Sequence, residues 1–145
     1  LSNLILLPFV REVYGMELVS IRSLAVHFTG LGAALALPGL ALVWLAMRIG
    51  YQLPISLAFV GLGYVYVVQM FAALPLIYGL YKSGSEAVVL RMNVAMVVLN
   101  FAGNLALIPV WGLEGALLSS AAVQTGGAVA YWLVVSRKVE KVALL

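Results

Sequence analysis

The sequence predicts an all-α protein, a polytopic bundle of four transmembrane helices. Hydrophobic residues make up 65% of the 145 residues and charged residues only 9%. A soluble domain carries about 25% charged and about 45–50% apolar residues, so a chain of this composition could not cover its surface with polar groups in water. Four apolar stretches are each long enough to cross a hydrocarbon core, which takes about 20 residues in a helix.

The first two predicted spans are residues 24–47 and 54–81. Neither contains Asp, Glu, Lys or Arg. Each contains one internal proline, Pro38 and Pro75 respectively, and proline removes a helical hydrogen bond and kinks a helix. We therefore expect two bent, uncharged transmembrane helices.

The third and fourth predicted spans are residues 88–109 and 113–136, and only a few residues separate them. A continuous helix over both would be roughly 70 Å long at ~1.5 Å per residue, against a ~30 Å hydrocarbon core. Pro109 interrupts helical hydrogen bonding, and Gly112 can adopt the positive φ of a tight turn. The sequence therefore predicts a helical hairpin.

Basic residues predict the orientation. With the spans alternating in direction, seven of the eight basic residues fall on one side and only Arg48 on the other. Loops rich in Lys and Arg stay in the cytoplasm, so both chain ends are expected there. The seven residues are Arg11, Arg22, Lys82, Arg91, Arg137, Lys138 and Lys141.

The flanking segments complete the predicted organisation. Residues 1–10 look like the stub of a preceding apolar helix, which favours a fragment of a longer chain. Residues 11–23 mix charged and apolar side chains and are expected to form a cytoplasmic interfacial linker. Residues 137–145 are expected to form a cytoplasmic tail.

Polar residues inside the spans are the candidates for a functional site, because burying them in lipid is expensive. Asn93, Asn100 and Asn104 lie at i, i+7 and i+11 and share one helical stripe. They either form hydrogen bonds between helices or line a water-filled substrate cavity. Gln69, at the centre of the second span, needs a partner on another helix or a cavity.

Two further side chains lie near the cytoplasmic ends of the spans. Arg91, one turn into the third span, can extend to the lipid headgroups or contact a lipid-linked phosphate. His27 could relay protons, but an interfacial or packing role is favoured because the spans offer it no carboxylate partner.

Small residues recur along the fourth span at intervals of three and four. Such a seam lets another helix backbone approach closely, so its predicted role is packing and not ligand contact. The seam consists of Gly115, Ser119, Ala122, Gly126 and Ala130.

Several kinds of chemistry have few residues to support them. The chain contains no cysteine and no aspartate, and His27 is its single histidine. Paired carboxylates, catalytic triads and metal cages all need such residues. We therefore expect no catalytic residue, no metal and no cofactor. The basic residues form no continuous face, which argues against nucleic acid as a partner.

The end of the third span and the start of the fourth contain a recognisable pattern over residues 100–116. Its residues include Asn100, Asn104, Leu107, Ile108, Pro109, Val110, Trp111, Gly112, Leu113, Glu114, Gly115 and Ala116. This pattern resembles the C-terminal region of the polysaccharide or lipid-linked oligosaccharide flippases of the multidrug/oligosaccharidyl-lipid/polysaccharide exporter superfamily. The resemblance covers most of the chain and is most specific over residues 100–116.

The resemblance implies the C-terminal part of a larger two-lobe transporter in the bacterial inner membrane. Such proteins export a lipid-linked sugar unit by alternating access. The implied partners are membrane lipid, the lipid-linked sugar substrate and an N-terminal lobe that the chain lacks. One alternative is a multidrug or metabolite antiporter of the same superfamily, although the spans contain no aspartate. Another is a small non-transporting membrane scaffold assembled through the small-residue seam.

Overall fold

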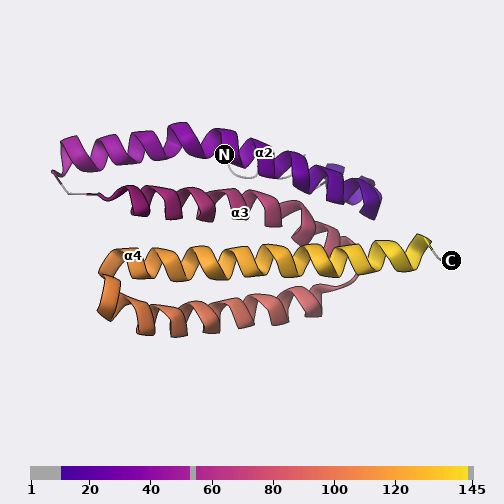
Figure 1. The fold of residues 1–145 in the computed structure, drawn as a ribbon. Helices are drawn as coiled ribbons and strands as arrows, with labels where there is room; N and C mark the ends of the chain where they lie inside the picture. The colour runs from indigo at the N-terminus through magenta and orange to yellow at the C-terminus, as the bar shows by residue number, and fades with distance from the viewer. Residues whose placement is uncertain (1–10, 53–54, 144–145) are drawn as a thin grey trace.

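The computed structural model describes residues 11–52 and 55–143, and helices are the regular elements within these ranges (Figure 1). Helix α2 spans Leu18–Leu45 and continues into a π-helical turn, η1, over Ala46–Gly50. Helix α3 spans Leu57–Lys82, and helix α4 spans Glu86–Ala143. The predicted all-α helical bundle is confirmed.

Helix α4 reverses direction at Gly112 and forms a hairpin (Figure 1). Gly112 has φ 55° and ψ −130°, a backbone conformation that glycine adopts without the steric penalty of a side chain. We call residues 86–111 the first arm and residues 113–143 the second arm. The helix continues through Pro109, so the expectation that proline ends it was wrong and the glycine alone makes the break.

Three helices are long and apolar enough to cross a membrane: α2 with η1, α3, and α4. The third of these is 56 residues long over Glu86–Lys141 and contains both the third and the fourth predicted spans. Many large apolar side chains point outward from it, among them Val97 and Phe101, 69% and 66% exposed. A surface of this kind is suited to lipid rather than to water.

Helix boundaries differ from the hydropathy boundaries at several points. Residues 18–23, expected in a linker, belong to α2, and residues 137–143, expected in a tail, continue α4. Residues 11–15 are also helical. Hydropathy marks where a segment leaves the hydrocarbon, but a helix continues beyond that depth, because long basic side chains can reach the headgroups from it. The predicted stub, residues 1–10, lies outside the described residues.

Local interactions explain where α3 begins and ends. The Oγ of Ser56 accepts a hydrogen bond from the Phe59 backbone N–H at 3.0 Å, which caps the first turn. At the other end, Gly84 has φ 66°, the Ser85 N–H donates to the Leu80 carbonyl and the Gly84 N–H donates to the Tyr81 carbonyl. This pair of bonds around a left-handed glycine terminates α3 and turns the chain into α4.

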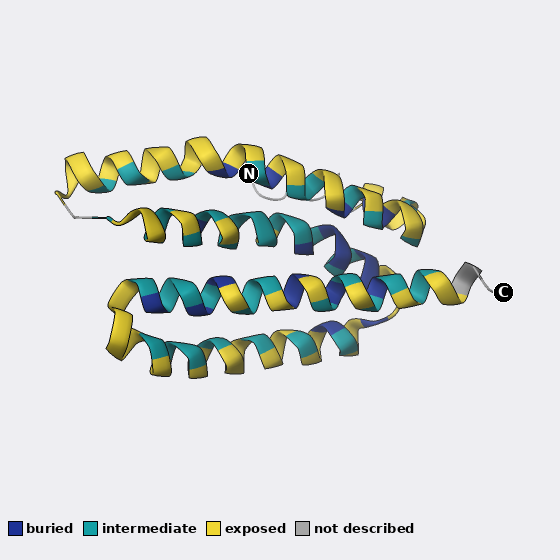
Figure 2. Ribbon diagram, viewed as in Figure 1, coloured by how far each residue is buried: buried dark blue, intermediate teal, exposed yellow. Residues whose placement is uncertain are grey.

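Helix α3 lies between α2 and the second arm, and the first arm packs on the far side of the second (Figure 1). The main buried hydrophobic cluster joins the end of α3 to α2 and to both arms (Figure 2). It lies at the end of the bundle that carries seven of the eight basic residues, which we call the basic end. Its members are Ala25, Ala73, Leu76, Leu80, Val89, Ala128, Tyr131 and Val135.

Candidate functional site

The asparagine stripe on the first arm faces the second arm. Asn93 Oδ1 accepts a hydrogen bond from the Tyr131 hydroxyl at 2.7 Å. Asn100 Nδ2 donates to Ser120 Oγ at 3.3 Å, and the Ser119 hydroxyl donates to the Asn100 carbonyl at 3.2 Å. For Asn93 and Asn100 the structure therefore shows hydrogen bonding between helices rather than the lining of a substrate cavity.

Asn104 differs from the other two asparagines. Its Oδ1 is buried and has no hydrogen-bond partner among the described residues. The residue lines a cavity of about 370 Å³ together with Phe101, Leu105, Ile108 and Pro109, all on the first arm. The stripe thus divides into two asparagines that hold the hairpin together and one that borders a cavity near the turn.

The predicted small-residue seam divides into two parts with different surroundings. Gly115 and Ser119 are buried against the first arm. A Cβ atom on Gly115 would lie 2.3 Å from the Leu107 carbonyl oxygen, and one on Gly103 would lie 2.2 Å from Ser119 Oγ. Close approach of the two backbones thus requires glycine at position 115, where the obstacle is backbone, whereas at position 103 the neighbour is the Ser119 side chain. This half of the seam packs as expected.

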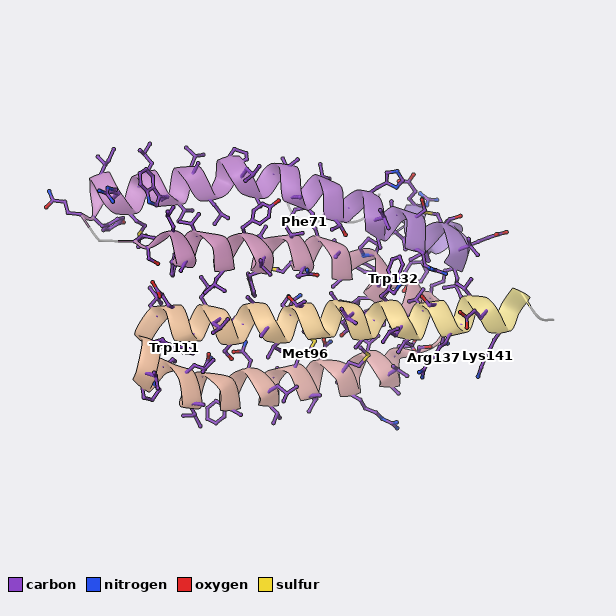
Figure 3. The ribbon with its side chains drawn as sticks, in the orientation of Figure 1. Phe71, Met96, Trp111, Trp132, Arg137 and Lys141 are labelled. Atoms are coloured by element: carbon purple, nitrogen blue, oxygen red, sulfur yellow. The ribbon has the colours of Figure 1, made fainter. Side chains whose placement is uncertain are left out.

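The other half of the seam lines an open groove between the two arms. Ala122, Gly126 and Ala130 border a cavity of about 450 Å³ whose opposite wall includes Met92 and Met96. A Cβ atom on Gly126 would meet nothing within 4 Å. Met96 lies between the arms in Figure 3. Within the described residues these three side chains therefore line a groove, and their packing against another helix stays a prediction.

Gln69 faces a cavity between α2, α3 and the second arm. The cavity has a volume of about 200 Å³, and Thr29 and Trp132 also line it. The Thr29 hydroxyl donates to the Ala25 carbonyl of its own helix at 2.7 Å. Of the two environments considered for Gln69, the structure shows the cavity.

Arg91 and His27 are both exposed. The Nδ1 atom of His27 lies 2.8 Å from the Ser23 carbonyl oxygen, one turn earlier in α2. This local contact fits an interfacial histidine. Arg91 lies on the first arm near the basic end and takes no part in the hydrogen bonds that Asn93 and Asn100 make with the second arm.

Three polar features were not anticipated from the sequence. The Arg22 guanidinium lies over the Trp132 ring, 5.0 Å from its centroid. The Arg22 Nε and Ser136 Oγ atoms are buried without a hydrogen-bond partner among the described residues. At the other end of the bundle, the Ser56 hydroxyl donates to a Glu114 carboxylate oxygen. The sequence signal for the stacking of Arg22 over Trp132 is that a basic residue and a tryptophan lie at the same predicted membrane depth.

A further cavity separates α2 from α3 in the half of the bundle away from the basic end. Its volume is about 480 Å³, and eight mainly apolar residues line it: Leu37, Leu40, Ala41, Trp44, Leu57, Val60, Gly61 and Tyr64. Packing of α2 on α3 is therefore uneven, with a buried core at the basic end and the cavity of about 480 Å³ toward the end that carries Arg48. The groove of about 450 Å³ between the arms instead reaches Met92 and Ala130, beside the core.

Among the described residues, no group of three or more His, Cys, Asp or Glu side chains could hold a metal ion. The sequence matches no protein-family model, and no curated protein or solved structure is detectably similar to it.

Proposed function

We propose that the chain forms the C-terminal part of a flippase that moves a lipid-linked oligosaccharide across the bacterial inner membrane by alternating access. The observation that carries the proposal is the uneven packing of the bundle. Apolar contacts hold α2, α3 and α4 together at the basic end. Toward the other end, a cavity of about 480 Å³ separates α2 from α3, while a groove of about 450 Å³ runs between the two arms beside the core.

This distribution of contacts suits a lobe that rocks in the membrane. Alternating access needs helices that move as rigid elements about a closed end while the opposite end opens and closes. At the opposite end of this bundle, an exposed hydrogen bond from Ser56 to Glu114 joins α3 to α4. Such an exposed polar contact contributes little stability and can break and re-form.

The cavity walls suit an amphiphilic substrate. Both cavities are lined almost entirely by aliphatic, aromatic and small side chains, which favour an isoprenoid or acyl chain over a free sugar. The sugar and its phosphate groups would then be handled by the second lobe that the flippase resemblance implies. The basic end, with seven of the eight basic residues, faces the cytoplasm in this proposal.

The test is export of surface polysaccharide in cells that lack the gene encoding this chain. We expect its loss on deletion and its recovery with the wild-type gene. Undiminished polysaccharide in the deletion strain would refute the proposal. Increased sensitivity to organic cations, with normal polysaccharide, would instead identify a drug antiporter.

A pair of substitutions tests the role of the cavities. Gly61 lines the cavity between α2 and α3, and Gly61→Leu would fill part of it. Gly39 is an exposed glycine of α2 with nothing within 4 Å of an added Cβ, so Gly39→Leu is the matched control. We expect Gly61→Leu to reduce export at normal protein levels and Gly39→Leu to leave it unchanged. Equal export by both variants would show that this cavity has no role in transport.

A further inference from the structure

Arg22 of α2 meets Trp132 of the second arm at the basic end, and Ser136 lies further along the same arm. Arg22 begins the second turn of α2, and its guanidinium stacks over the Trp132 ring at 5.0 Å. Ser136 is one helical turn beyond Trp132, so the two side chains share a face of the second arm. Figure 3 shows Trp132 on that arm, close to the basic end marked by Arg137 and Lys141.

Two buried polar atoms in this site have unused hydrogen-bonding capacity. They are Nε of Arg22 and Oγ of Ser136, and neither has a partner among the described residues. Leaving a buried polar group unpaired is costly, and the cost is higher for a charged group. Native proteins rarely leave such groups unpaired unless a ligand or water satisfies them.

The chemistry of these two atoms selects the class of ligand. Arg22 Nε can only donate a hydrogen bond, and Arg22 carries a permanent positive charge. The Ser136 hydroxyl can donate a second hydrogen bond. A negatively charged acceptor with several oxygens, such as a phosphate group, suits both donors, whereas a metal cation would be repelled by the Arg22 charge.

The surroundings favour a phosphate at the membrane surface. Arg137 and Lys138 follow Ser136 directly, whereas the next carboxylate along α4, that of Glu140, is exposed one turn further out. Tryptophan is enriched at the depth of the lipid headgroups, and the cytoplasmic leaflet holds the anionic lipids. The Trp132 ring also borders the cavity that contains Gln69, so an acyl chain would find apolar surface beside the site.

We propose that Arg22 and Ser136, with Trp132 as the supporting wall, bind the phosphate group of an anionic phospholipid at the basic end of the bundle. The inference needs only that the chain is embedded in a membrane and does not depend on the transport function. It predicts a defined lipid site in addition to diffuse attraction between basic residues and anionic lipid.

Titration of the full chain in dodecylmaltoside tests the site, with short-chain phosphatidylglycerol, short-chain phosphatidylcholine and inorganic phosphate as separate ligands. Replacing Trp44 and Trp111 by Phe leaves Trp132 as the single tryptophan, so its fluorescence reports on the site. We expect saturable binding of phosphatidylglycerol and weaker binding of phosphatidylcholine. Inorganic phosphate that competes at equal affinity would support the phosphate site and identify the phosphate alone as the recognised group.

Three variants separate a defined site from general charge attraction. Arg22→Gln should weaken phosphatidylglycerol binding about ten-fold or more, because it removes a charged hydrogen bond. Ser136→Ala should weaken it by about three- to ten-fold, through the loss of a neutral one. Arg137→Gln, an equal charge change at an exposed residue of the same end, should leave the affinity within about two-fold.

Circular dichroism and thermal unfolding check that each variant is folded. Ser136→Ala removes a hydroxyl with no partner among the described residues, so it should not destabilise the ligand-free chain even if Arg22→Gln does. The proposal would be overturned if Arg22→Gln and Arg137→Gln weakened binding equally. It would also be overturned if well-folded Ser136→Ala bound like the wild type, or if neither phosphatidylglycerol nor phosphate bound saturably.

Discussion

The two halves of the small-residue seam should respond oppositely to an added methyl group. Gly115→Ala places a Cβ atom 2.3 Å from the Leu107 carbonyl oxygen, whereas Gly126→Ala places one where nothing lies within 4 Å. Real Cβ atoms almost never approach another heavy atom closer than 3.0 Å, so in the first variant the two arms must move apart by at least about 0.7 Å. The obstacle is backbone, which cannot rotate away as a side chain can.

Overpacking of this kind costs about 1–3 kcal/mol. For Gly126→Ala the steric term is zero, and the higher helix propensity of alanine adds up to about 1 kcal/mol of stability in water. We therefore expect the free energy of unfolding to fall by about 1–3 kcal/mol in Gly115→Ala and to stay equal or rise slightly in Gly126→Ala. The two variants make the same chemical change on the same helix, so each is the control for the other.

The assay is reversible unfolding in mixed dodecylmaltoside and sodium dodecyl sulfate micelles, followed by circular dichroism. Trp111, which lies beside the turn (Figure 3), adds a local fluorescence signal for opening of the hairpin. Equal unfolding midpoints for Gly115→Ala and Gly126→Ala would refute the close approach of the arms at Leu107.

Three further predictions concern contacts between elements. Tyr131→Phe removes the hydroxyl that donates to Asn93 at 2.7 Å. Hydrogen bonds between membrane helices contribute about 0.6 kcal/mol on average, so the free energy of unfolding should fall by about 0.5–1.7 kcal/mol. No change would show that this bond is not formed. Ser56→Ala removes the α3 cap and the contact with Glu114 and should cost about 1 kcal/mol in the same assay, whereas a neutral result would contradict the cap. Because the chain has no native cysteine, Asn100→Cys with Ser120→Cys should form a disulfide within the hairpin, and Val98→Cys with Ser120→Cys, which starts from an outward-facing side chain, should not. A straight helix would hold positions 100 and 120 about 30 Å apart, so absence of the first crosslink would contradict the hairpin.

Composition and hydropathy suffice to predict the helices of this protein. The lack of charges over residues 24–47 and 54–81 locates α2 and α3, and the length of the apolar region from 88 to 136 requires a reversal. Residues 82–86 are polar and include a glycine, as a turn requires, and Gly84 there adopts a left-handed conformation. These features depend on local sequence, so a single chain reveals them.

Contacts between helices could be predicted only in part. The spacing of Asn93 and Asn100 places them on one stripe, but periodicity does not reveal that Tyr131 and Ser120 would be their partners. The seam from Gly115 to Ala130 is regular in sequence, yet the arms diverge along it, so only its first half is packed. The pairing of Arg22 with Trp132 joins residues far apart in the chain and depends on how α2 and α4 meet.

We infer that this chain crosses the membrane four times, with α4 crossing twice. Single cysteines in the cysteine-free chain test it through a maleimide that cannot pass the membrane, applied to intact cells and to permeabilised cells. Tyr51→Cys and Leu113→Cys, both exposed at the end opposite the basic residues, should react in intact cells. Glu86→Cys and Lys141→Cys should react only after permeabilisation. Reaction of Leu113→Cys on the same side as Glu86→Cys, or its protection under both conditions, would contradict four crossings.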